Sequence, residues 1–449
     1  MRDLTQGAIW KHLAGMSVFI AIGLLVQTLY LLIDLYFVSR LGKEAVAGVA
    51  AAGTSTFLTM AVSQLVAVGA LSLISQAVGR KDQGDAQLVF EQALSMGLAI
   101  GVAFLVLGYL VGRSLIGLVA ADAVTAGNAV SYFYWFLPSL VVLFPGAALG
   151  SALRASGVVG APMMIQSVTV LLNAILAPVL IAGWLTGHPM GVAGAGLASS
   201  IAAGFGTLAM LVLFNRLQKY MRLHGTLTPD FAVWKRLTKV GLPSTGEFAM
   251  LFLVISIAYW AIQGFGPQAQ AGFGIGSRVM QAIFLPAMAV AFATAPIAGQ
   301  NFGAGQAARV RATFAHAAVI SSGIMLALTL LCHVSPALLV SPFTKDPAVI
   351  AVAVEYLRIS SWNFVAVGLV FSCSGLFQAL GDTRPALLSS ASRLLTYAVP
   401  AAWLKAQPWV TLHDFWYLSV ASITVQMVVS LLLLRHQLHH KLKALVAQV

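Results

Sequence analysis

The chain has 449 residues, of which 59% are hydrophobic and only 8% are charged. A soluble protein needs about 25% charged residues to cover its surface, so this composition excludes a water-soluble body. The formal net charge is +12, but the basic residues flank apolar runs and form no continuous patch, which argues against nucleic-acid binding. The composition therefore indicates a membrane protein whose main solvent is the lipid bilayer.

Twelve apolar runs are long enough to cross a bilayer, which takes ~20 residues of helix. The first run, from Leu13 to Val38, is too long for a cleavable signal sequence and has no small-residue cleavage site, so we predict a retained helix. The sequence predicts an all-α membrane protein with spanning helices near 13–38, 46–76, 88–112, 127–152, 162–184, 191–215, 237–262, 270–297, 310–334, 348–378, 385–404 and 415–435.

The Lys and Arg residues are divided unequally between the two sets of alternate loops. The sparsely charged set contains only Arg40, Lys43, Arg113, Lys345 and Lys405. Positive residues stay in the cytoplasm, so this asymmetry predicts a multi-pass protein of the bacterial inner membrane with both termini cytoplasmic.

The second half of the chain repeats the first at an offset of 224 residues. The matched pairs include Trp10 and Trp234, Gly42 and Gly266, Gln76 and Gln300, Tyr132 and Tyr356, and Gly157 and Gly381. The repeat predicts two six-helix bundles related by a pseudo-twofold axis along the membrane normal, with a cavity between them. We expect an N-terminal lobe (1–215), a basic cytoplasmic linker (216–236) and a C-terminal lobe (237–449), an architecture that favours alternating access over a channel.

Eleven of the 13 acids are assigned to loops, tails or helix ends, and two are assigned to helix interiors, Asp34 and Glu247. An ionised side chain at the bilayer centre costs about 2.5–3.5 kcal/mol, so both are candidates for function. Asp34 shares one helical face with Gln27 and Tyr30, and it could exchange a proton or hold Na⁺. The structural alternative is a fixed hydrogen bond or ion pair. Glu247 lies near the cytoplasmic start of its helix, where it could line the inner mouth of a cavity or reach water.

Basic groups inside the predicted helices are rare. Arg393 is the only base deep in an apolar run, and we predict that it pairs with backbone carbonyls or a polar neighbour. The tail residues His436, His439 and His440 have a spacing that metal ligands use on a helix, but we interpret them as a basic cytoplasmic tail. The chain has no nucleotide-binding loop and no catalytic constellation, so we expect no enzyme activity, no cofactor and no metal, and a coupling ion as the energy source.

Five segments give the chain a resemblance to a known family. They are Ile-Asp-Leu-Tyr-Phe-Val-Ser-Arg-Leu-Gly at 33–42, Gly-Val-Ala-Gly-Ala-Gly-Leu-Ala-Ser at 191–199, Gly-Leu-Pro at 241–243, Gly-Gln-Asn-Phe-Gly at 299–303 and Phe-Gln-Ala-Leu-Gly-Asp-Thr-Arg-Pro at 377–385. Together they resemble the multidrug and toxic compound extrusion (MATE) family, and the first helix is similar to that of its DinF-like branch. The resemblance implies a MATE-like fold and export of lipophilic, often cationic compounds by H⁺ or Na⁺ antiport.

The resemblance also implies a cation-coupling site in the N-terminal lobe. In DinF-like members the acid of the first helix is the centre of this site, and Asp34, Tyr30, Gln27, Asn173 and Ser199 match that pattern. The family often has a second acid four residues after the Asn, where this chain has an alanine. A tight Na⁺ site needs several oxygens and negative charge, so the missing carboxylate favours H⁺.

An adaptable apolar wall is predicted for the substrate cavity. Its members are Phe248, Phe252, Trp260, Met280 and Phe284, and Glu247 is a further candidate for lining the cavity. Lipid contact or helix packing is the alternative for each aromatic or Met side chain. We expect small-molecule drugs or toxic organic cations as substrates and a monomeric protein.

Three alternative functions fit the sequence less well. A lipid-linked glycan flippase of the same superfamily would share the architecture, but such proteins often carry several cavity bases, and here only Arg278 and Arg393 could serve. An ion channel is disfavoured by the two-lobed repeat, and a membrane enzyme by the missing catalytic constellation.

Overall fold

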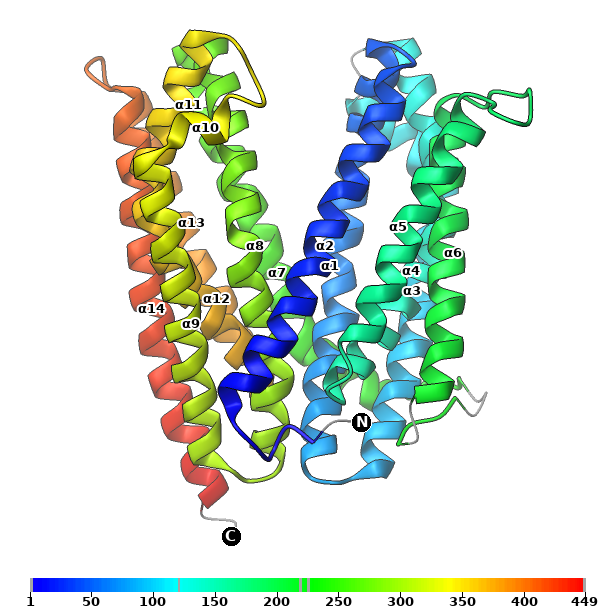
Figure 1. Cartoon of the computed structure of the whole chain (residues 1–449), viewed down its shortest axis with the longest axis vertical. Helices are drawn as coiled ribbons and strands as arrows, with labels where there is room; N and C mark the ends of the chain where they lie inside the picture. Colours follow the sequence, from blue (N-terminus) through cyan, green and yellow to red (C-terminus); the bar gives the residue numbers. More distant parts are fainter. Residues whose placement is uncertain (1–2, 120–121, 218–219, 224–226, 447–449) are drawn as a thin grey trace. The chain divides into compact units, whose positions relative to one another are not determined.

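The computed structural model describes an all-helical chain (Figure 1). The described residues are 3–119, 122–217, 220–223 and 227–446. Within the helices, the side chains of 30–32, 34–35, 51, 54–57, 118–119 and 444–446 also lie outside the description. The chain divides into two compact units, each described here by itself.

Each half of the chain contributes its own set of helices. The first half forms α1 (Ile9–Ser39), α2 (Lys43–Gly79), α3 (Gln83–Val119), α4 (Ala123–Ala155), α5 (Gly160–Ile181) and α6 (Val192–Leu217). The second half forms α7 (Phe231–Ala261), the 3-10 turn η1 (Ile262–Phe265), α8 (Pro267–Gly303), α9 (Ala307–Val334), α10 (Pro336–Val340), α11 (Pro347–Ser360), the 3-10 turn η2 (Ser361–Asn363), α12 (Phe364–Ala379), α13 (Arg384–Lys405) and α14 (Leu412–Val446).

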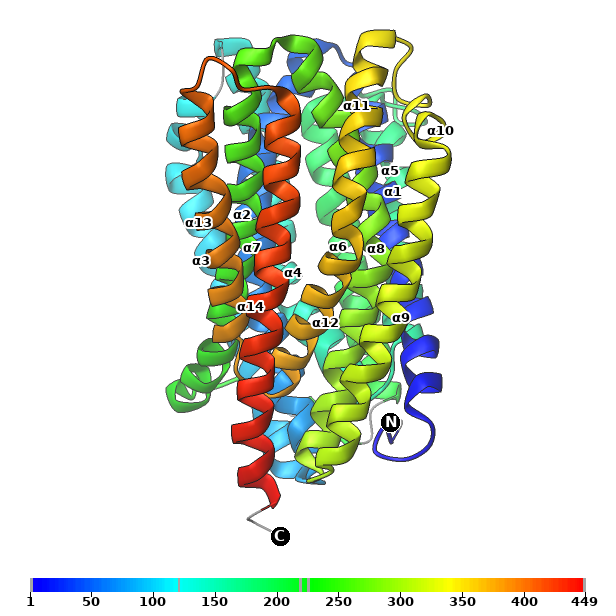
Figure 2. The same cartoon turned by 90° about the vertical axis from the view of Figure 1, so that its left-hand side faces the viewer.

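The predicted twelve-helix, all-α membrane architecture is confirmed. Among the described residues, eleven helical segments are long and apolar enough to cross a membrane. The twelfth predicted span is α13, which has 22 residues but carries Arg384, Arg393 and Lys405, so it is less apolar than the others. It packs beside α14 within unit 2 (Figure 2). A polar helix that packs against its neighbours can contain charges that an isolated span could not.

The span predicted at 348–378 corresponds to the helical segment Pro347–Ala379, but the sequence did not predict the 3-10 turn that interrupts this segment. The structure breaks it at η2, between α11 and α12. The break frees backbone carbonyls, and the hydroxyl of Thr329 on α9 donates to the carbonyl of Ser361 at 3.0 Å. A neighbouring helix thus satisfies a backbone group that lipid could not, which is how breaks are tolerated in membranes. The short helix α10 was also not predicted.

The repeat has a geometric counterpart in the turns. Gly42 precedes α2 with φ +113°, and its repeat partner Gly266 precedes α8 with φ +91°. Gly157 after α4 and Gly381 after α12 likewise have φ +78° and +71°. Residues other than glycine rarely adopt these positive φ angles. The predicted matches therefore mark turns with the same backbone conformation in both halves.

Helix packing repeats as well. A Cβ added to Gly48 would lie 2.8 Å from Asn128 on α4, and one added to Gly272 would lie 2.6 Å from Val352 on α11. Both pairs stand at the repeat offset of 224 residues. Small residues let membrane helices approach closely, so the same close contact is built in each half.

The boundaries of the two units fall within helices α1 and α7. Unit 1 comprises Ile22–Leu242, and unit 2 comprises Leu4–Ala21 and the chain from Pro243 onward. The start of α1 therefore belongs to unit 2, and the start of α7 belongs to unit 1. In unit 1, Gly241 of α7 approaches α2 so closely that an added Cβ would lie 2.0 Å from the Leu65 carbonyl oxygen.

The beginning of the described chain is held in unit 2 by hydrogen bonds. Leu4 is fully buried, and its N–H donates to Oε1 of Gln300 at 2.9 Å. Its carbonyl accepts from Nδ2 of Asn301 at 3.1 Å. Arg309 then donates to Oδ1 of Asn301 at 2.7 Å and to the carbonyl of Gly7 at 3.0 Å. Gln300 and Asn301 belong to a segment that carries the family resemblance, and the structure gives that segment this anchoring role.

Candidate functional site

The predicted coupling acid lies on α1, in unit 1. The backbone of Asp34 and Tyr30 is helical, but both side chains lie outside the described residues. Gln27, one turn before Tyr30, is half-buried. Gly23 is eleven residues before Asp34, so positions 23 and 34 share a face of the helix. An added Cβ on Gly23 would lie 2.1 Å from the sulfur of Met163, so this face of α1 meets α5.

Two of the predicted coupling residues meet in unit 1. Asn173 on α5 is fully buried, and its Nδ2 donates to the hydroxyl oxygen of Ser199 on α6 at 3.4 Å. The other amide atom of Asn173, Oδ1, is buried and has no hydrogen-bond partner among the described residues. A buried acceptor left unpaired costs about 1–3 kcal/mol, so this oxygen is poised to receive a donor.

The position of the missing family acid is also in the interior of unit 1. Ala177 stands one helical turn after Asn173 and is fully buried. A methyl group therefore occupies the place where the family pattern would put a second carboxylate. The amide of Asn173 has no carboxylate partner on its own helix.

The second predicted acid, Glu247, is half-buried on α7 within unit 2. Its Oε2 accepts a hydrogen bond of 3.0 Å from the hydroxyl of Ser374 on α12. The sequence did not indicate Ser374, because 127 residues separate the partners. Among the described residues, the hydrogen-bond donor to Glu247 is therefore a neutral hydroxyl and not a basic side chain.

The predicted apolar wall is distributed over α7 and α8. Met280 is 7% exposed and belongs to the core of unit 2, against which Phe284 packs. Phe284 also meets Phe364 edge-to-face, with ring centroids 5.6 Å apart. On α7, Phe248 is half-buried and Phe252 is 44% exposed. The α8 pair thus lies in the packed interior, whereas the Phe252 side chain is partly exposed.

Two polar residues of unit 2 have buried side-chain atoms without a hydrogen-bond partner among the described residues. Asn363 at η2 is 1% exposed, and neither of its amide atoms has a hydrogen-bond partner among the described residues. The sequence did contain an indication of Asn363, because this polar residue interrupts an apolar run. Arg393 on α13 has a buried Nε that is likewise without a partner in the described chain, near Tyr356 and Tyr397.

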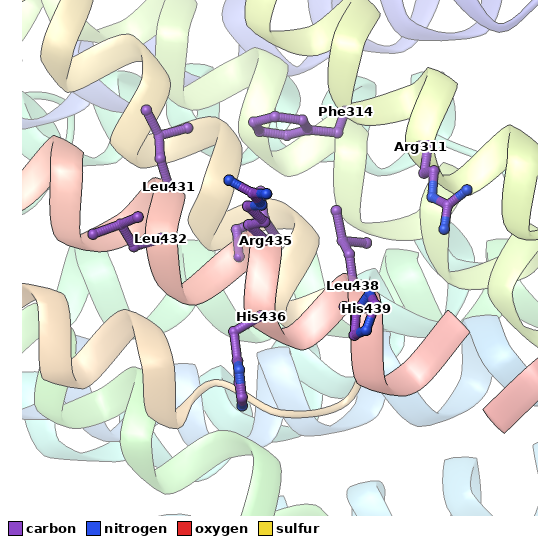
Figure 3. Close-up of a pocket in the computed structure, with 9 residues that line it drawn as sticks. Arg311, Phe314, Leu431, Leu432, Arg435, His436, Leu438 and His439 are labelled. Atoms are coloured by element: carbon purple, nitrogen blue, oxygen red, sulfur yellow. The ribbon is translucent and has the colours of Figure 1, made fainter. Parts of the chain in front are cut away.

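A basic groove lies outside the predicted sites, between α9 and α14 of unit 2 (Figure 3). Its volume is about 630 Å³. The lining side chains are those of Arg311, Phe314, Leu431, Leu432, Leu434, Arg435, His436, Leu438 and His439. The predicted tail histidines His436 and His439 therefore line a groove at the end of α14.

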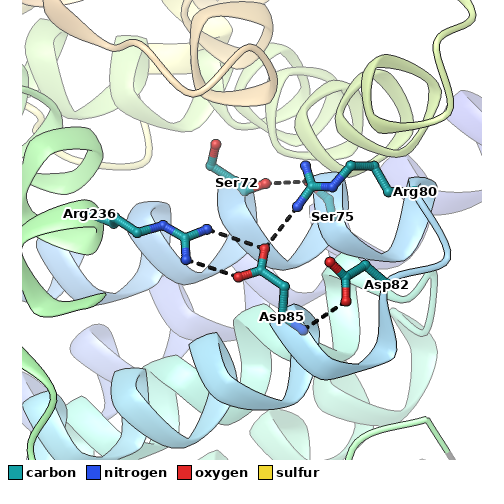
Figure 4. Close-up of polar contacts among 6 residues, drawn as sticks. All are labelled: Ser72, Ser75, Arg80, Asp82, Asp85 and Arg236. Carbon is teal, nitrogen blue, oxygen red and sulfur yellow. Dashed lines mark hydrogen bonds and ion pairs between the residues drawn. The ribbon is translucent and has the colours of Figure 1, made fainter. Parts of the chain in front are cut away.

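A second charged cluster fixes the start of α7 in unit 1 (Figure 4). Arg236 makes a bidentate contact with Asp85 on α3, at 2.9 and 3.2 Å. Arg80 donates to the same carboxylate at 2.8 Å, and Asp82 accepts from the backbone N–H of Asp85 at 3.0 Å. Bidentate pairs fix geometry, so this cluster sets where α7 begins.

No group of three or more metal-ligating side chains occurs in the part of the chain that the structure describes. The arrangement offers buried amides, hydroxyls and isolated carboxyls. Such groups can bind a proton or a cation weakly and release it, but they do not form a catalytic constellation.

Known proteins resemble this chain over nearly its whole length. A protein from Bacillus subtilis described as "Probable multidrug resistance protein YpnP" is 27% identical over 424 residues, which cover 92% of this chain and 90% of that protein. The "FAD transporter" of Shewanella oneidensis is 24% identical over 416 residues, covering 89% of each. The solved structure of a MOP superfamily transporter from Pyrococcus furiosus has the same fold, with a TM-score of 0.90 at 23% identity and 98% coverage of both chains.

The MatE family profile matches residues 20–179 and 243–404, which together make up most of the chain and fall in both halves. These relatives give no support to the flippase alternative. Members of the family are transporters, need no cofactor and are not enzymes. The chain therefore belongs to the MatE family of multi-pass membrane transporters.

Proposed function

We propose that this chain exports lipophilic, often cationic small molecules across the bacterial inner membrane in exchange for H⁺. Several relatives are described as multidrug resistance or multidrug export proteins, which supports drugs or toxic organic cations as substrates. The basic loops support cytoplasmic termini. In this proposal the chain acts as a monomer of the DinF-like branch. The lobes 1–215 and 237–449 move so that the substrate site opens alternately to the two sides of the membrane.

The unpaired Oδ1 of Asn173 is the observation that supports proton coupling most directly. A protonated carboxyl can donate a hydrogen bond, whereas an ionised one can only accept. In our proposal Asp34 is ionised when the drug binds. When Asp34 takes a proton from outside, it donates to a polar partner such as this Oδ1, α1 shifts and the drug leaves. Tyr30, Gln27 and Ser199 complete the polar network.

Na⁺ is the alternative coupling ion. It would need several oxygen ligands and negative charge around it. Asn173 and Ser199 could supply neutral oxygens, but Ala177 stands where a second carboxylate would be needed. A single proposed acid therefore favours H⁺.

Transport by everted membrane vesicles tests the coupling. Efflux of a cationic dye is measured under a pH gradient alone and under a Na⁺ gradient alone, for the wild type and for Asp34→Asn. Glu44→Gln, an exposed acid at the start of α2, is the matched control. We expect the pH gradient to drive efflux in the wild type and the control but not in Asp34→Asn. Normal transport by Asp34→Asn, or efflux driven only by Na⁺, would contradict the proposal.

The proposed substrate wall is tested separately. Glu247, Phe248, Phe252, Met280 and Phe284 would contact the drug in our proposal. Phe252→Ala, at an exposed side chain, should raise the KM for bulky dyes without changing the pH dependence of efflux. An unchanged KM for every dye tested would remove Phe252 from the substrate site.

Anionic dinucleotide-like substrates are a second candidate, favoured by Arg393. Its buried Nε has no partner in the described residues, so it could receive an anionic group. One relative is described as an FAD transporter. FAD uptake into everted vesicles that falls in Arg393→Gln but not in the exposed Arg278→Gln would favour this substrate class. Absence of FAD transport by the wild type would eliminate it.

A further inference from the structure

The groove between α9 and α14 has a composition that neither drug transport nor proton coupling uses. Four of its nine lining residues are Arg or His, and none is acidic. Arg311 comes from α9, while Arg435, His436 and His439 come from α14 (Figure 3). In the described chain, neither Arg311 nor Arg435 forms an ion pair with a carboxylate. The groove therefore holds positive charge that is not paired with a carboxylate of the described residues.

The polarity of the groove changes along the helix axes. On α14, Leu431 and Leu432 come first, and Arg435 and His439 follow toward the end of the chain. The eight residue steps from Leu431 to His439 rise about 12 Å along the axis. On α9, which starts at this end, Arg311 likewise precedes Phe314. The cationic groups therefore lie toward the helix ends, and the apolar groups lie toward the middle of the spanning segments.

This order matches the structure of a phospholipid at a membrane interface. Apolar side chains next to spanning helices face acyl chains, whereas groups at helix ends stand at headgroup depth. Basic pockets between membrane helices on the cytoplasmic side are suited to anionic headgroups. Arginine binds phosphate oxygens through two N–H groups at once, so two arginines on different helices can hold one phosphate between them.

We propose that this groove binds one anionic phospholipid. The phosphate lies between Arg311 and Arg435, and His436 and His439 stand beside the headgroup. One acyl chain follows Leu431, Leu432 and Phe314 toward the membrane interior. A soluble phosphate would leave this apolar half of the groove uncovered. A choline headgroup would place a cation among four basic side chains, so the site selects for net negative charge.

Native mass spectrometry of the full chain in detergent tests the site. Binding of phosphatidylglycerol and of phosphatidylcholine with the same acyl chains is compared for the wild type and for the double variant Arg311→Gln/Arg435→Gln. Each basic residue near an anionic headgroup contributes about fivefold in affinity, so we expect a roughly 30-fold loss for the double variant. The matched control is Arg216→Gln/Arg222→Gln, which removes two exposed arginines of unit 1 and should bind like the wild type.

Three results would overturn the proposal. The first is equal affinity of the wild type for the two lipids, and the second is an equal loss of phosphatidylglycerol affinity in both double variants. The third is displacement of phosphatidylglycerol by glycerol phosphate, which would show that the site binds simple anions. A photoactivatable phosphatidylglycerol crosslinked to the wild type gives a test that does not depend on how the variant folds. Crosslinks should map to peptides containing 311–314 or 431–439, and crosslinks found only elsewhere would contradict the assignment.

Discussion

The hydroxyl of Ser374 donates a 3.0 Å hydrogen bond to Oε2 of Glu247, and this bond joins α12 to α7 within unit 2. Ser374 is 6% exposed, so its removal would leave the carboxyl with one fewer donor in a poorly hydrated place. Hydrogen bonds to charged groups are worth about 1.5–3 kcal/mol. We expect Ser374→Ala to lower the thermal unfolding midpoint of the purified protein measurably, and Glu247→Gln to be tolerated better, because an amide can still accept from Ser374.

The control for this prediction is Ser372→Ala on the same helix. Ser372 is fully buried, but its hydroxyl donates to the carbonyl of Gly368, which already belongs to the helical hydrogen-bond ladder. Its loss should cost about 1 kcal/mol or less. Equal destabilisation by the two serine variants would show that the Glu247 contact has no special weight.

Ala177→Asp should create sensitivity to Na⁺. The substitution puts a carboxylate one turn after Asn173, where it could add charge and oxygens to the Asn173–Ser199 pair. We expect a Na⁺ gradient to drive dye efflux by this variant but not by the wild type, in everted vesicles at fixed pH. Ala177→Asn is the control of the same size without charge. If Ala177→Asp inserts normally but still ignores Na⁺, the number of carboxylates does not decide the coupling ion.

Gly241→Ala should destabilise unit 1. An added Cβ would lie 2.0 Å from the Leu65 carbonyl oxygen, and the atoms it meets are backbone atoms that cannot rotate away. Overpacking of this kind costs about 1–3 kcal/mol. Gly204→Ala on α6 is the control, because nothing lies within 4 Å of its added Cβ. Detergent-solubilised Gly241→Ala should unfold at a clearly lower temperature than Gly204→Ala; equal midpoints would mean that α2 and α7 can separate at little cost.

The N-cap of α4 should make stability depend on acid pH. Asp122 accepts a hydrogen bond from the backbone N–H of Thr125 at 2.8 Å, and this bond lowers the pKa of its carboxyl. Because the folded-state pKa is depressed, the cap contributes fully above the unfolded pKa of about 4 and is lost as pH falls through the folded value. We expect Asp122→Ala to unfold at a lower temperature than the wild type at pH 7, with the difference shrinking below about pH 4. A difference that is constant with pH would contradict an ionised cap.

Much of the fold could be predicted, because lipid imposes simple rules. Runs of ~20 apolar residues with polar ends were enough to locate the twelve predicted membrane spans. The repeat offset also predicted which glycines match, and Gly42 and Gly266 both have a positive φ before equivalent helices. These features depend on local sequence, so no knowledge of neighbours was needed.

Other features depend on partners that are remote in sequence. The break at η2 has no Pro or Gly within it, and its carbonyl is satisfied by Thr329 from another helix. The Asn173–Ser199 pair followed from family resemblance and not from spacing. The basic groove forms because α9 and α14 lie side by side in unit 2, although their lining residues are over 100 residues apart in the sequence.

The assignment of Leu4–Ala21 to unit 2 constrains the order in which the chain folds during synthesis. Leu4 is synthesised 296 residues before its hydrogen-bond partner Gln300. At about 5–20 residues per second, the N-terminal segment waits roughly 15–60 s before its binding place in unit 2 exists. The start of α7, by contrast, follows unit 1 directly and can dock on arrival. The docking of Leu4 in unit 2 therefore cannot precede the synthesis of Gln300, so this part of unit 2 forms late although one of its two partners is made early.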